Sequence, residues 1–262
     1  MVRSFEERLR ARSAAVYADF LLPRLKNASN ILDVGCGAGS ITIGLAADVP
    51  GARVVGVDPD DGFEPARRHA AAQRIDNVEF RVGDVYGLEF QSDHFDACLC
   101  HSMLETLDRP LDGLLEIRRV LKPGGILGVA CVEYGGLILA GPSVELLRQF
   151  YAVREQLWQL DGHADPYRGR ELRGLLERAG FEGVRATSSY ICYGTPEDVT
   201  TFGTDRAKDC GNTWYRRDAI AHGLATEAEI DRMRGAWLEW STSEEAYAAF
   251  AWCRALGRKP RS

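Results

Sequence analysis

A glycine-rich turn and an acidic residue at a set distance from it are the features most able to support chemistry. Gly35, Gly37 and Gly39 stand in the run GCGAGS, which follows a mostly apolar run at 31–34. A main chain without Cβ atoms can turn sharply there and let a ligand approach closely. Asp58, 19 residues past Gly39, closes the next apolar run. An acid at that place accepts hydrogen bonds from both ribose hydroxyls of a nucleotide-like ligand.

A second acid follows the third apolar run. Asp84 and Val85 come just after the run at 77–82, where a carboxylate can hold the exocyclic amine of adenine. Each aspartate alone is typical of a turn or a cap. Together, at successive strand ends after a glycine turn, they predict a ligand site.

The glycine spacing bears on which nucleotide binds. A dinucleotide fingerprint needs its third glycine at position 40, where this chain has Ser40 and places the glycine at 39 instead. The spacing therefore disfavours nicotinamide and flavin cofactors.

Alternating strands and helices must position these residues. The sequence predicts strands at 31–34, 53–57, 77–82, 95–100 and 125–132, and helices at 40–47, 63–74 and 111–121, with a turn at 122–124. Such alternation predicts right-handed βαβ units and a parallel sheet covered by helices on both faces. The fold class is α/β, doubly wound and mostly parallel.

The second half of the chain is richer in aromatic residues. Residues 134–262 hold 16 of the 24 aromatics and all five tryptophans. We predict a helix at 169–180, a strand at 182–193, a final edge strand at 246–256, and helices within 134–167 and 194–245. Two more strands make the sheet seven-stranded.

Five motifs in order carry a family resemblance. They are ILDVGCGAGS, VGVD, NVEFRVGDV, FDACLCHSMLETL and RVLKPGG within residues 31–133, with GRELRGLLERAGF at 169–181 adding family features. The chain resembles a class I S-adenosylmethionine-dependent methyltransferase of the small-molecule type, near the ubiquinone/menaquinone-biosynthesis-like group. The fold implied is Rossmann-like, with a helical C-terminal insert capping the active site.

The resemblance implies a single methyltransferase domain over residues 1–262. Its parts would be an N-terminal helical lid (1–29), an S-adenosylmethionine-binding half (30–133), a helical substrate cap (134–167 and 194–245), and the final helix and strands of the sheet (168–193 and 246–258). The lid corresponds to an amphipathic helix expected at 5–26.

Carried over residue by residue, the resemblance implies S-adenosylmethionine as the cofactor. Asp33 and the glycines would border its methionine part, Asp58 its ribose, Asp84 its adenine, and His101 its sulfonium. The expected cofactor-contacting residues are Tyr17, Asp33, Gly35, Cys36, Gly37, Gly39, Asp58, Pro59, Asp84, Val85 and His101. The Cys36 position is commonly Cys or Thr in the family and implies no thiol chemistry. Thr106 replaces the second histidine of a usual pair, which removes a histidine-pair mechanism.

Methyl transfer by in-line displacement needs the methyl donor and the acceptor to be held close together, aligned and shielded from water. An oxygen or nitrogen acceptor of high pKa also benefits from a base. The candidates for catalysis are His101, Glu133 and Tyr134. Two of them have an alternative role: the His101 ring only packs or hydrogen-bonds, and Tyr134 lines a pocket beside a flexible glycine pair at 135–136.

The aromatic residues allow two interpretations. Trp237 and Trp240 look like one face of a cap helix and could simply fill it. Alternatively, Trp214, Tyr215 and Tyr167 line an apolar pocket for a small molecule. His163 is expected in an exposed turn.

Composition limits the partners. A formal charge of −6 argues against nucleic acid, and no stretch is long and apolar enough to cross a membrane. Seven cysteines without a Cys-x-x-Cys pair predict free thiols in a cytoplasmic protein, a monomer or homodimer acting on a small-molecule acceptor without a metal. The alternative functions are a nicotinamide-dependent oxidoreductase and a non-catalytic S-adenosylmethionine-binding protein.

Overall fold

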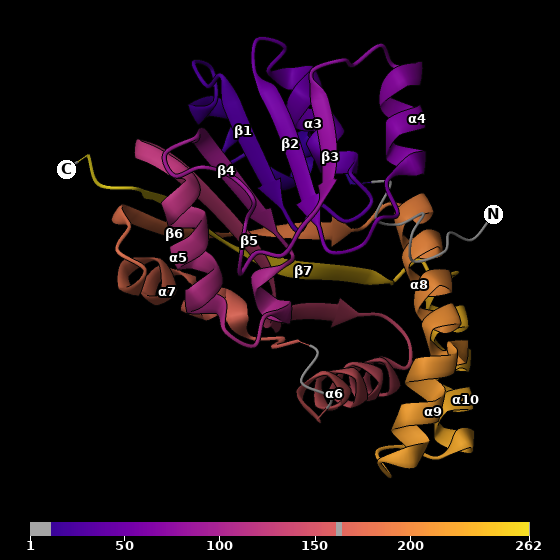
Figure 1. The fold of residues 1–262 in the computed structure, drawn as a ribbon. Coiled ribbons are helices and arrows are strands. Elements are labelled where there is room, and N and C mark those ends of the chain that lie inside the picture. The colour runs from indigo at the N-terminus through magenta and orange to yellow at the C-terminus, as the bar shows by residue number, and fades with distance from the viewer. Residues whose placement is uncertain (1–11, 161–163, 262) are drawn as a thin grey trace. The chain divides into compact units, whose positions relative to one another are not determined.

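A seven-stranded sheet organises the chain in the computed structural model, which describes residues 12–160 and 164–261. Its strands lie in the order β3-β2-β1-β4-β5-β7-β6 (Figure 1). They are β1 (Asn30–Val34), β2 (Arg53–Asp58), β3 (Val78–Val82), β4 (Phe95–His101), β5 (Leu121–Ala140), β6 (Glu182–Tyr193) and β7 (Tyr247–Arg258). The pairs β1–β2, β2–β3, β1–β4 and β4–β5 are parallel. The order reverses between β1 and β4, where doubly wound sheets bind ligands.

The seven predicted strands are confirmed, with two corrections. The last strand, β7, lies between β5 and β6, so β6 forms the edge of the sheet and the predicted edge position of the last strand is wrong. The fifth strand is also longer than predicted, because β5 includes the turn expected at 122–124 and continues to Ala140.

Two compact units make up the described chain. The sheet unit comprises 12–132, 168–188 and 253–261, and the aromatic unit comprises 133–160, 164–167 and 189–252. Each of β5, β6 and β7 has residues in both units. That the whole chain acts as one domain stays a prediction.

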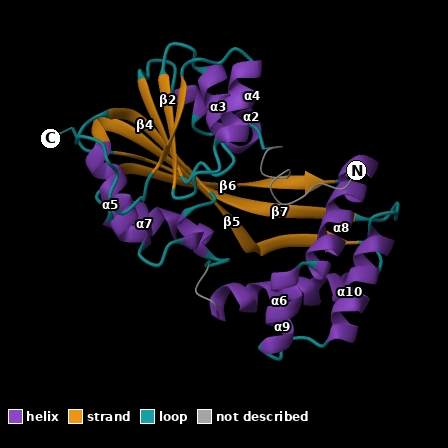
Figure 2. Ribbon diagram, turned by 45° about the vertical axis from the view of Figure 1, so that its right-hand side comes forward, coloured by secondary structure: helices purple, strands orange, loops and turns teal. Residues whose placement is uncertain are grey.

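Two helical layers cover the sheet unit. Ile31, Val54 and Leu99 share one core cluster with residues of α2 (Ala14–Tyr17) and α3 (Ser40–Asp48). Their neighbours Leu32 and Val55 join a second cluster with α5 (Pro110–Val120) and α7 (Leu172–Arg178). Figure 2 shows α2, α3 and α4 (Glu64–Ala72) together, and α5 beside α7. Successive strand residues therefore face opposite layers, as the alternation of Cβ directions requires.

The N-terminal segment differs from the predicted amphipathic helix. Within its described part only α2 and a 3₁₀ turn, η1 (Leu22–Arg24), are helical, so a continuous helix to residue 26 is wrong. Pro23 has no amide hydrogen to extend a helix. Ala14 packs closely on α3: a Cβ added at Gly44 of that helix would lie 2.8 Å from the Cβ of Ala14. Tertiary packing has replaced local helix periodicity here.

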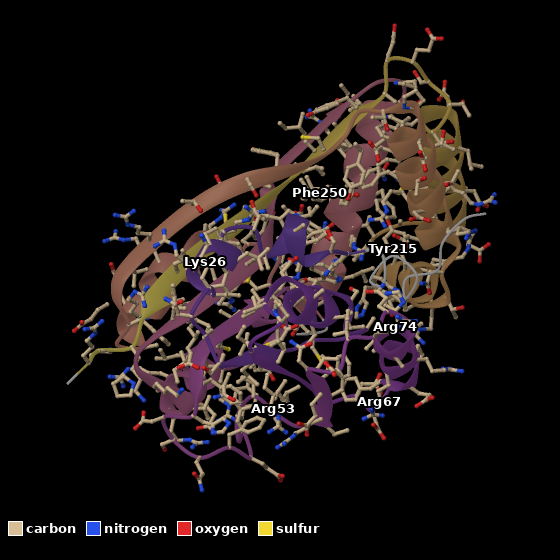
Figure 3. All side chains as sticks on the ribbon, turned by 90° about the horizontal axis from the view of Figure 1, so that it is seen from above. Lys26, Arg53, Arg67, Arg74, Tyr215 and Phe250 are labelled. Carbon is tan, nitrogen blue, oxygen red and sulfur yellow. The ribbon has the colours of Figure 1, made fainter. Side chains whose placement is uncertain are left out.

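Four helices form most of the aromatic unit: α6 (Val144–Leu160), α8 (Pro196–Gly211), α9 (Thr213–Ala221) and α10 (Glu227–Trp240). They confirm the helices predicted within 134–167 and 194–245, except that 134–140 belong to β5. Trp237 and Trp240 are fully buried with ring centroids 5.6 Å apart, and Phe250 of β7 packs in the same cluster (Figure 3). These two tryptophans fill the helical cap, as the first interpretation held. Two further 3₁₀ turns are η2 (Leu104–Thr106) and η3 (Arg168–Glu171).

No helix within the described ranges combines the length and apolar character needed to cross a bilayer.

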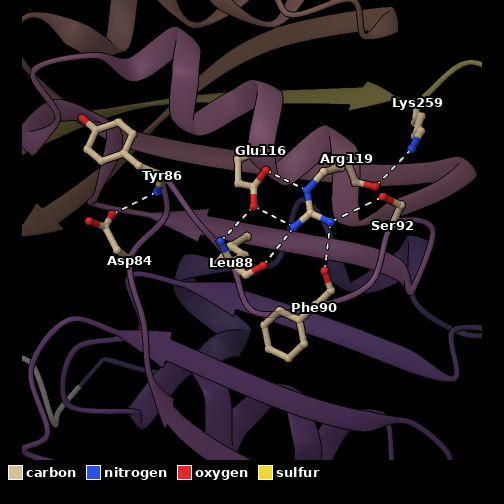
Figure 4. Close-up of polar contacts among 8 residues, drawn as sticks. All are labelled: Asp84, Tyr86, Leu88, Phe90, Ser92, Glu116, Arg119 and Lys259. Atoms are coloured by element: carbon tan, nitrogen blue, oxygen red, sulfur yellow. Dashed lines mark hydrogen bonds and ion pairs between the residues drawn. The ribbon is translucent and has the colours of Figure 1, made fainter.

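An arginine clamp holds the connection between β3 and β4. Arg119 of α5 donates hydrogen bonds to the carbonyls of Leu88 and Phe90, each at 2.9 Å, and pairs with Glu116 at 2.7 Å (Figure 4). Glu116 in turn accepts the Leu88 amide at 2.8 Å. The clamp fixes the segment that follows Asp84.

Replacing Arg119 with Met should lower the free energy of unfolding by about 1–3 kcal/mol, because two largely buried carbonyls lose their donors. Urea titration measures this difference. Arg68→Met is the matched control, because Arg68 forms only an exposed ion pair with Glu64 at 3.6 Å and should change stability by less than about 0.5 kcal/mol. Equal losses of unfolding free energy in both variants would contradict a stabilising role for the Arg119 clamp.

Candidate functional site

The glycine turn joins β1 to α3 and uses its three glycines differently. Gly35, Gly37 and Gly39 have φ of 73°, 49° and 75°, in the left-handed region that favours glycine. A Cβ at Gly35 would lie 2.5 Å from the Met103 side chain, and one at Gly39 would lie 2.6 Å from Phe80. A Cβ at Gly37 would meet no atom within 4 Å. Gly35 and Gly39 therefore permit packing, whereas Gly37 faces open space.

Asp58 at the end of β2 is brought to this turn, as predicted. Its Oδ2 accepts the Gly37 amide at 2.8 Å, and its Oδ1 accepts the Asp60 amide at 3.2 Å. Asp58 is half-buried and Pro59 beside it is exposed. A carboxylate offers about four acceptor positions, so Asp58 retains capacity for ribose hydroxyls.

Asp33 lies buried behind the turn. Its Oδ2 accepts the Thr42 hydroxyl at 2.7 Å. Burial raises the pKa of Asp33 to about 7, the Thr42 hydrogen bond lowers it, and the Asp58 charge raises it. Burial also raises the pKa of the Cys36 thiol. The thiol stays protonated at neutral pH, in keeping with the expectation that Cys36 does no thiol chemistry.

Asp84 lies two residues beyond the end of β3 and is exposed. Its Oδ1 accepts the Tyr86 amide at 2.9 Å (Figure 4), which is the turn geometry that an isolated aspartate forms. Val85 beside it is buried in the sheet unit. Contact of these residues with adenine stays a prediction.

His101 ends β4 and is buried against the N-terminal segment. Its ring meets that of Tyr17 edge to face at 5.0 Å, and the Arg12 guanidinium lies 5.4 Å from the Tyr17 ring centre. Burial, then the charges of Arg12 and Arg254, hold the pKa of His101 well below its usual value. The imidazole is therefore neutral at pH 7. Tyr17 and His101, predicted separately, lie together.

Arg254 of β7 contacts the N-terminal segment that carries Tyr17. It pairs with Asp19 at 2.9 Å and donates to the Val16 carbonyl at 3.3 Å, and its guanidinium lies over the Phe20 ring. The segment carrying Tyr17 is thereby held in place within the sheet unit.

Glu105 is a site residue that sequence reasoning missed. It lies in η2 and is buried, with the Cys131 thiol and the Ser102 side chain close to its carboxyl group. Burial raises its pKa, while the nearby Cys131 thiol lowers it. A glutamate inside the apolar run MLETL was the available signal, because carboxylates are rarely buried without a reason. Ser102, which precedes η2, has φ 55°, a strained conformation for a non-glycine residue.

Glu133 and Tyr134 fall in β5 and belong to the aromatic unit. Glu133 is buried and its Oε1 accepts the Gly135 amide at 3.0 Å. Tyr134 is buried among rings, 5.1 Å from that of Trp158. The glycine pair is part of the strand, and a Cβ at Gly136 would lie 2.4 Å from that of Ala251, so the expected flexibility is wrong.

The second interpretation of the aromatic residues is wrong for Tyr215 and stays a prediction for Trp214 and Tyr167. Tyr215, labelled in Figure 3, is fully buried and donates its hydroxyl to the Phe150 carbonyl at 3.2 Å, so it belongs to the core. Trp214 is half-buried under Arg154, and the hydroxyl of Tyr167 donates to Glu155 at 2.5 Å. His163 lies outside the described residues.

A shallow depression beside α4 and β3 is lined by charges of both signs, among them Arg67 and Arg74 (Figure 3), Asp76 and Glu79. Arg67 donates to the Phe80 carbonyl at 3.3 Å, a structural use. None of the predicted site residues lines this depression.

Several known proteins are similar in sequence to this chain. A family model described as "Methyltransferase domain" matches residues 32–129. The "Uncharacterized methyltransferase C1B3.06c" of Schizosaccharomyces pombe is 32% identical over 195 residues, covering 71% of this chain and 69% of that protein. The "Probable methyltransferase ltbC" of Aspergillus luteorubrus is 29% identical over 272 residues, covering 97% and 93%.

Among solved structures, phosphoethanolamine N-methyltransferase 2 of Haemonchus contortus, in complex with phosphomonomethylethanolamine and S-adenosylhomocysteine, matches with a TM-score of 0.55. The identity is 17%, and the match covers 92% of this chain and 52% of that one. It shares the fold of the chain.

Asp58→Ala should weaken binding of S-adenosylhomocysteine by about 1.5–3 kcal/mol, because charge-assisted hydrogen bonds are lost. This corresponds to roughly ten- to 150-fold in Kd by isothermal calorimetry. Asp61→Ala, at an exposed position nearby, is the control and should bind like the parent protein. Unchanged affinity in Asp58→Ala would remove Asp58 from the site.

Asp33 should make stability depend on pH. Its pKa of about 7 in the folded chain exceeds the ordinary 3.8, so its contribution to stability is fully present below pH 3.8 and is lost as pH rises through 7. The stability of Asp33→Asn relative to the parent should therefore rise between pH 4 and pH 7, by about 1.4 kcal/mol per unit of pKa difference.

Urea titrations at several pH values measure this, and Thr42→Val provides the matched variant. Removing the Thr42 hydroxyl takes away the hydrogen bond that lowers the pKa of Asp33. The pH range over which Asp33 loses its contribution to stability should therefore extend to higher pH. If the free energy of unfolding varied with pH in the same way for Asp33→Asn and the parent, the raised pKa of the buried Asp33 carboxyl would be contradicted.

Proposed function

The chain belongs to the class I S-adenosylmethionine-dependent methyltransferases, and we propose that it methylates an O, N or C atom of a small, partly apolar organic acceptor. S-adenosylmethionine is its cofactor. Family membership does not favour the oxidoreductase or the non-catalytic alternative. The observation that carries the proposal is a neutral, buried His101 in the same unit as the glycine turn and Asp58.

Residues of the sheet unit would hold the cofactor. Gly37 leaves space at the turn, Asp58 has acceptor capacity for the ribose, and Asp84 with Val85 would meet the adenine. When bound, S-adenosylmethionine supplies a methyl group made electrophilic by its sulfonium. Asp33 is buried beside the turn and would border the methionine part.

His101 would accept the proton that the acceptor loses. Because its pKa lies well below the usual value, the ring is neutral near pH 7. The same low pKa makes it a weak base, which suits an acceptor whose attacking group is itself acidic. The Tyr17 ring lies against His101 and supports exclusion of water.

Glu105 would act as a positioning residue. Burial raises the pKa of its carboxyl group. It lies on η2, in the same connection as Met103, which contacts the turn at Gly35. Hydrogen bonds of this buried carboxyl group would order the segment that follows His101.

The test of the function is S-adenosylhomocysteine formation with purified protein, S-adenosylmethionine, and separate sets of small phenols, carboxylic acids, amines and carbon acids. We expect turnover with at least one set, each product identified by mass. Cofactor binding without transfer to any set would contradict the proposed acceptor class.

His101→Gln should lower kcat by about 10²–10⁴-fold, the usual contribution of a general base, while S-adenosylhomocysteine affinity changes little. Steady-state kinetics and calorimetry on the same preparation separate the two effects. His69→Gln, an exposed histidine of α4, is the control and should retain turnover. A parallel loss of binding and turnover would restrict His101 to a packing role.

A further inference from the structure

One edge of the sheet is formed by β3, whose five residues, VEFRV, form a near-palindrome of residue types. β3 is the first strand in the sheet order, and within residues 12–160 and 164–261 it pairs with β2 only (Figure 1). Val78 and Val82 stand at its ends, Phe80 at its centre, and Glu79 and Arg81 on either side of the centre. A half-turn about Phe80 exchanges the two valines with each other and exchanges the acid with the base.

The main chain of β3 turns every second residue toward the outside of the sheet. Just past its end, the Gly83 amide donates to the Asp58 carbonyl of β2 at 3.0 Å. The hydrogen-bonding groups of successive residues point to opposite sides of a strand. Val82, Phe80 and Val78 therefore direct their amides and carbonyls away from β2, as an edge strand does toward a further strand.

A depression next to this edge keeps the strand approachable. Arg67 and Arg74 (Figure 3), with Ala70 and Ala71 between them, line the depression on the side of α4. The short alanine side chains leave the space between the two arginines open. Arg67 donates to the Phe80 carbonyl at 3.3 Å, in agreement with the outward direction of that carbonyl. A carbonyl oxygen has two lone pairs, so it can accept a second hydrogen bond.

The two charged side chains of β3 lie on the face opposite to Phe80, because they are one residue away from it on either side. Arg81 pairs with Glu79 at 2.6 Å, and Arg53 of β2 pairs with the same carboxylate. The hydrogen bond from Arg81 is the main reason that the pKa of Glu79 lies below its usual value. The side chains of Glu79 and Arg81 are 35% and 41% exposed, so both charges remain open to a further partner at the edge.

These charges favour one arrangement for a second copy of the same edge. In an antiparallel pair centred on Phe80, Glu79 of each copy lies opposite Arg81 of the other. Moving the centre to Glu79 or to Arg81 would place two like charges opposite each other, and a parallel pair in register would do so at both positions. Opposite charges across a strand pair stabilise it, and like charges destabilise it.

We propose that two copies of this chain associate through their β3 edges, antiparallel and about a two-fold axis at Phe80, so that two sheet units form one continuous sheet. The outward amides and carbonyls of the two strands would exchange hydrogen bonds. Val82, which is 56% exposed in the single chain, would lie opposite Val78 of the second copy. Such a contact uses the same surface on both copies, as two-fold dimers do.

The surface is separate from the predicted cofactor contacts, none of which lies in β3. The proposal therefore does not depend on the acceptor. Sedimentation equilibrium of the full chain, from micromolar to submillimolar concentration, tests it. We expect the mass to approach twice the 29.0 kDa of the single chain at the highest concentrations. A mass that stays at 29.0 kDa throughout would overturn the proposal.

Two charge reversals test the register. Glu79→Arg leaves β3 with positive charges only, and Arg81→Glu leaves it with negative charges only. Each variant alone should raise the dimer dissociation constant by at least about tenfold, because like charges then lie opposite each other at two places. An equal mixture of the two variants should form a heterodimer about as stable as the parent dimer, since every charge again faces its opposite. Damage to the fold of either variant would not be repaired by mixing.

Arg173→Glu is the matched control. Arg173 of α7 is exposed and pairs with Glu177 at 2.9 Å, so the same reversal removes a comparable ion pair away from β3 and should leave dimerisation unchanged. Val82→Pro removes an outward amide and should weaken the dimer. Circular dichroism checks folding, and if Val82→Pro fails to fold, the mixing experiment still decides. A dimer that both charge reversals leave intact, or one that mixing does not restore, would overturn the proposal.

Discussion

The backbone after β1 adopts positive φ at three nearby residues, and the rest of the sheet unit's site depends on this constraint. Because Gly35 and Gly39 lack a Cβ, Met103, which follows β4, and Phe80 of β3 can pack against the turn. The amide of Gly37 then reaches Asp58 at the end of β2. Residues from four neighbouring strands or their ends therefore meet at one turn, and Gly37 faces open space.

Burial sets the charge state of the groups around that turn. Asp33 and Glu105 have raised pKa values and His101 has a lowered one, and desolvation is the largest cause in each case. All three are thereby shifted toward their neutral forms. The fixed charges beside His101 come from Arg12 and Arg254.

The aromatic unit follows a different principle. Its rings bury large apolar areas, and its arginines remain charged because a guanidinium does not deprotonate in proteins. Stacking on Trp158 and Trp214 keeps Arg154 desolvated while Asp209 offsets part of the charge.

Local sequence determined the strands and helices of the sheet unit, the glycine turn, and the position of Asp58, because apolar periodicity and glycine φ preferences act over a few residues. It did not determine that β7 lies inside the sheet, that the N-terminal segment breaks after Tyr17, or that Glu105 is buried. Nor did it reveal that Arg154 and Arg206, 52 residues apart, share Asp209. Strand order, burial and ion pairing depend on residues distant in the chain, which meet only when the tertiary structure forms.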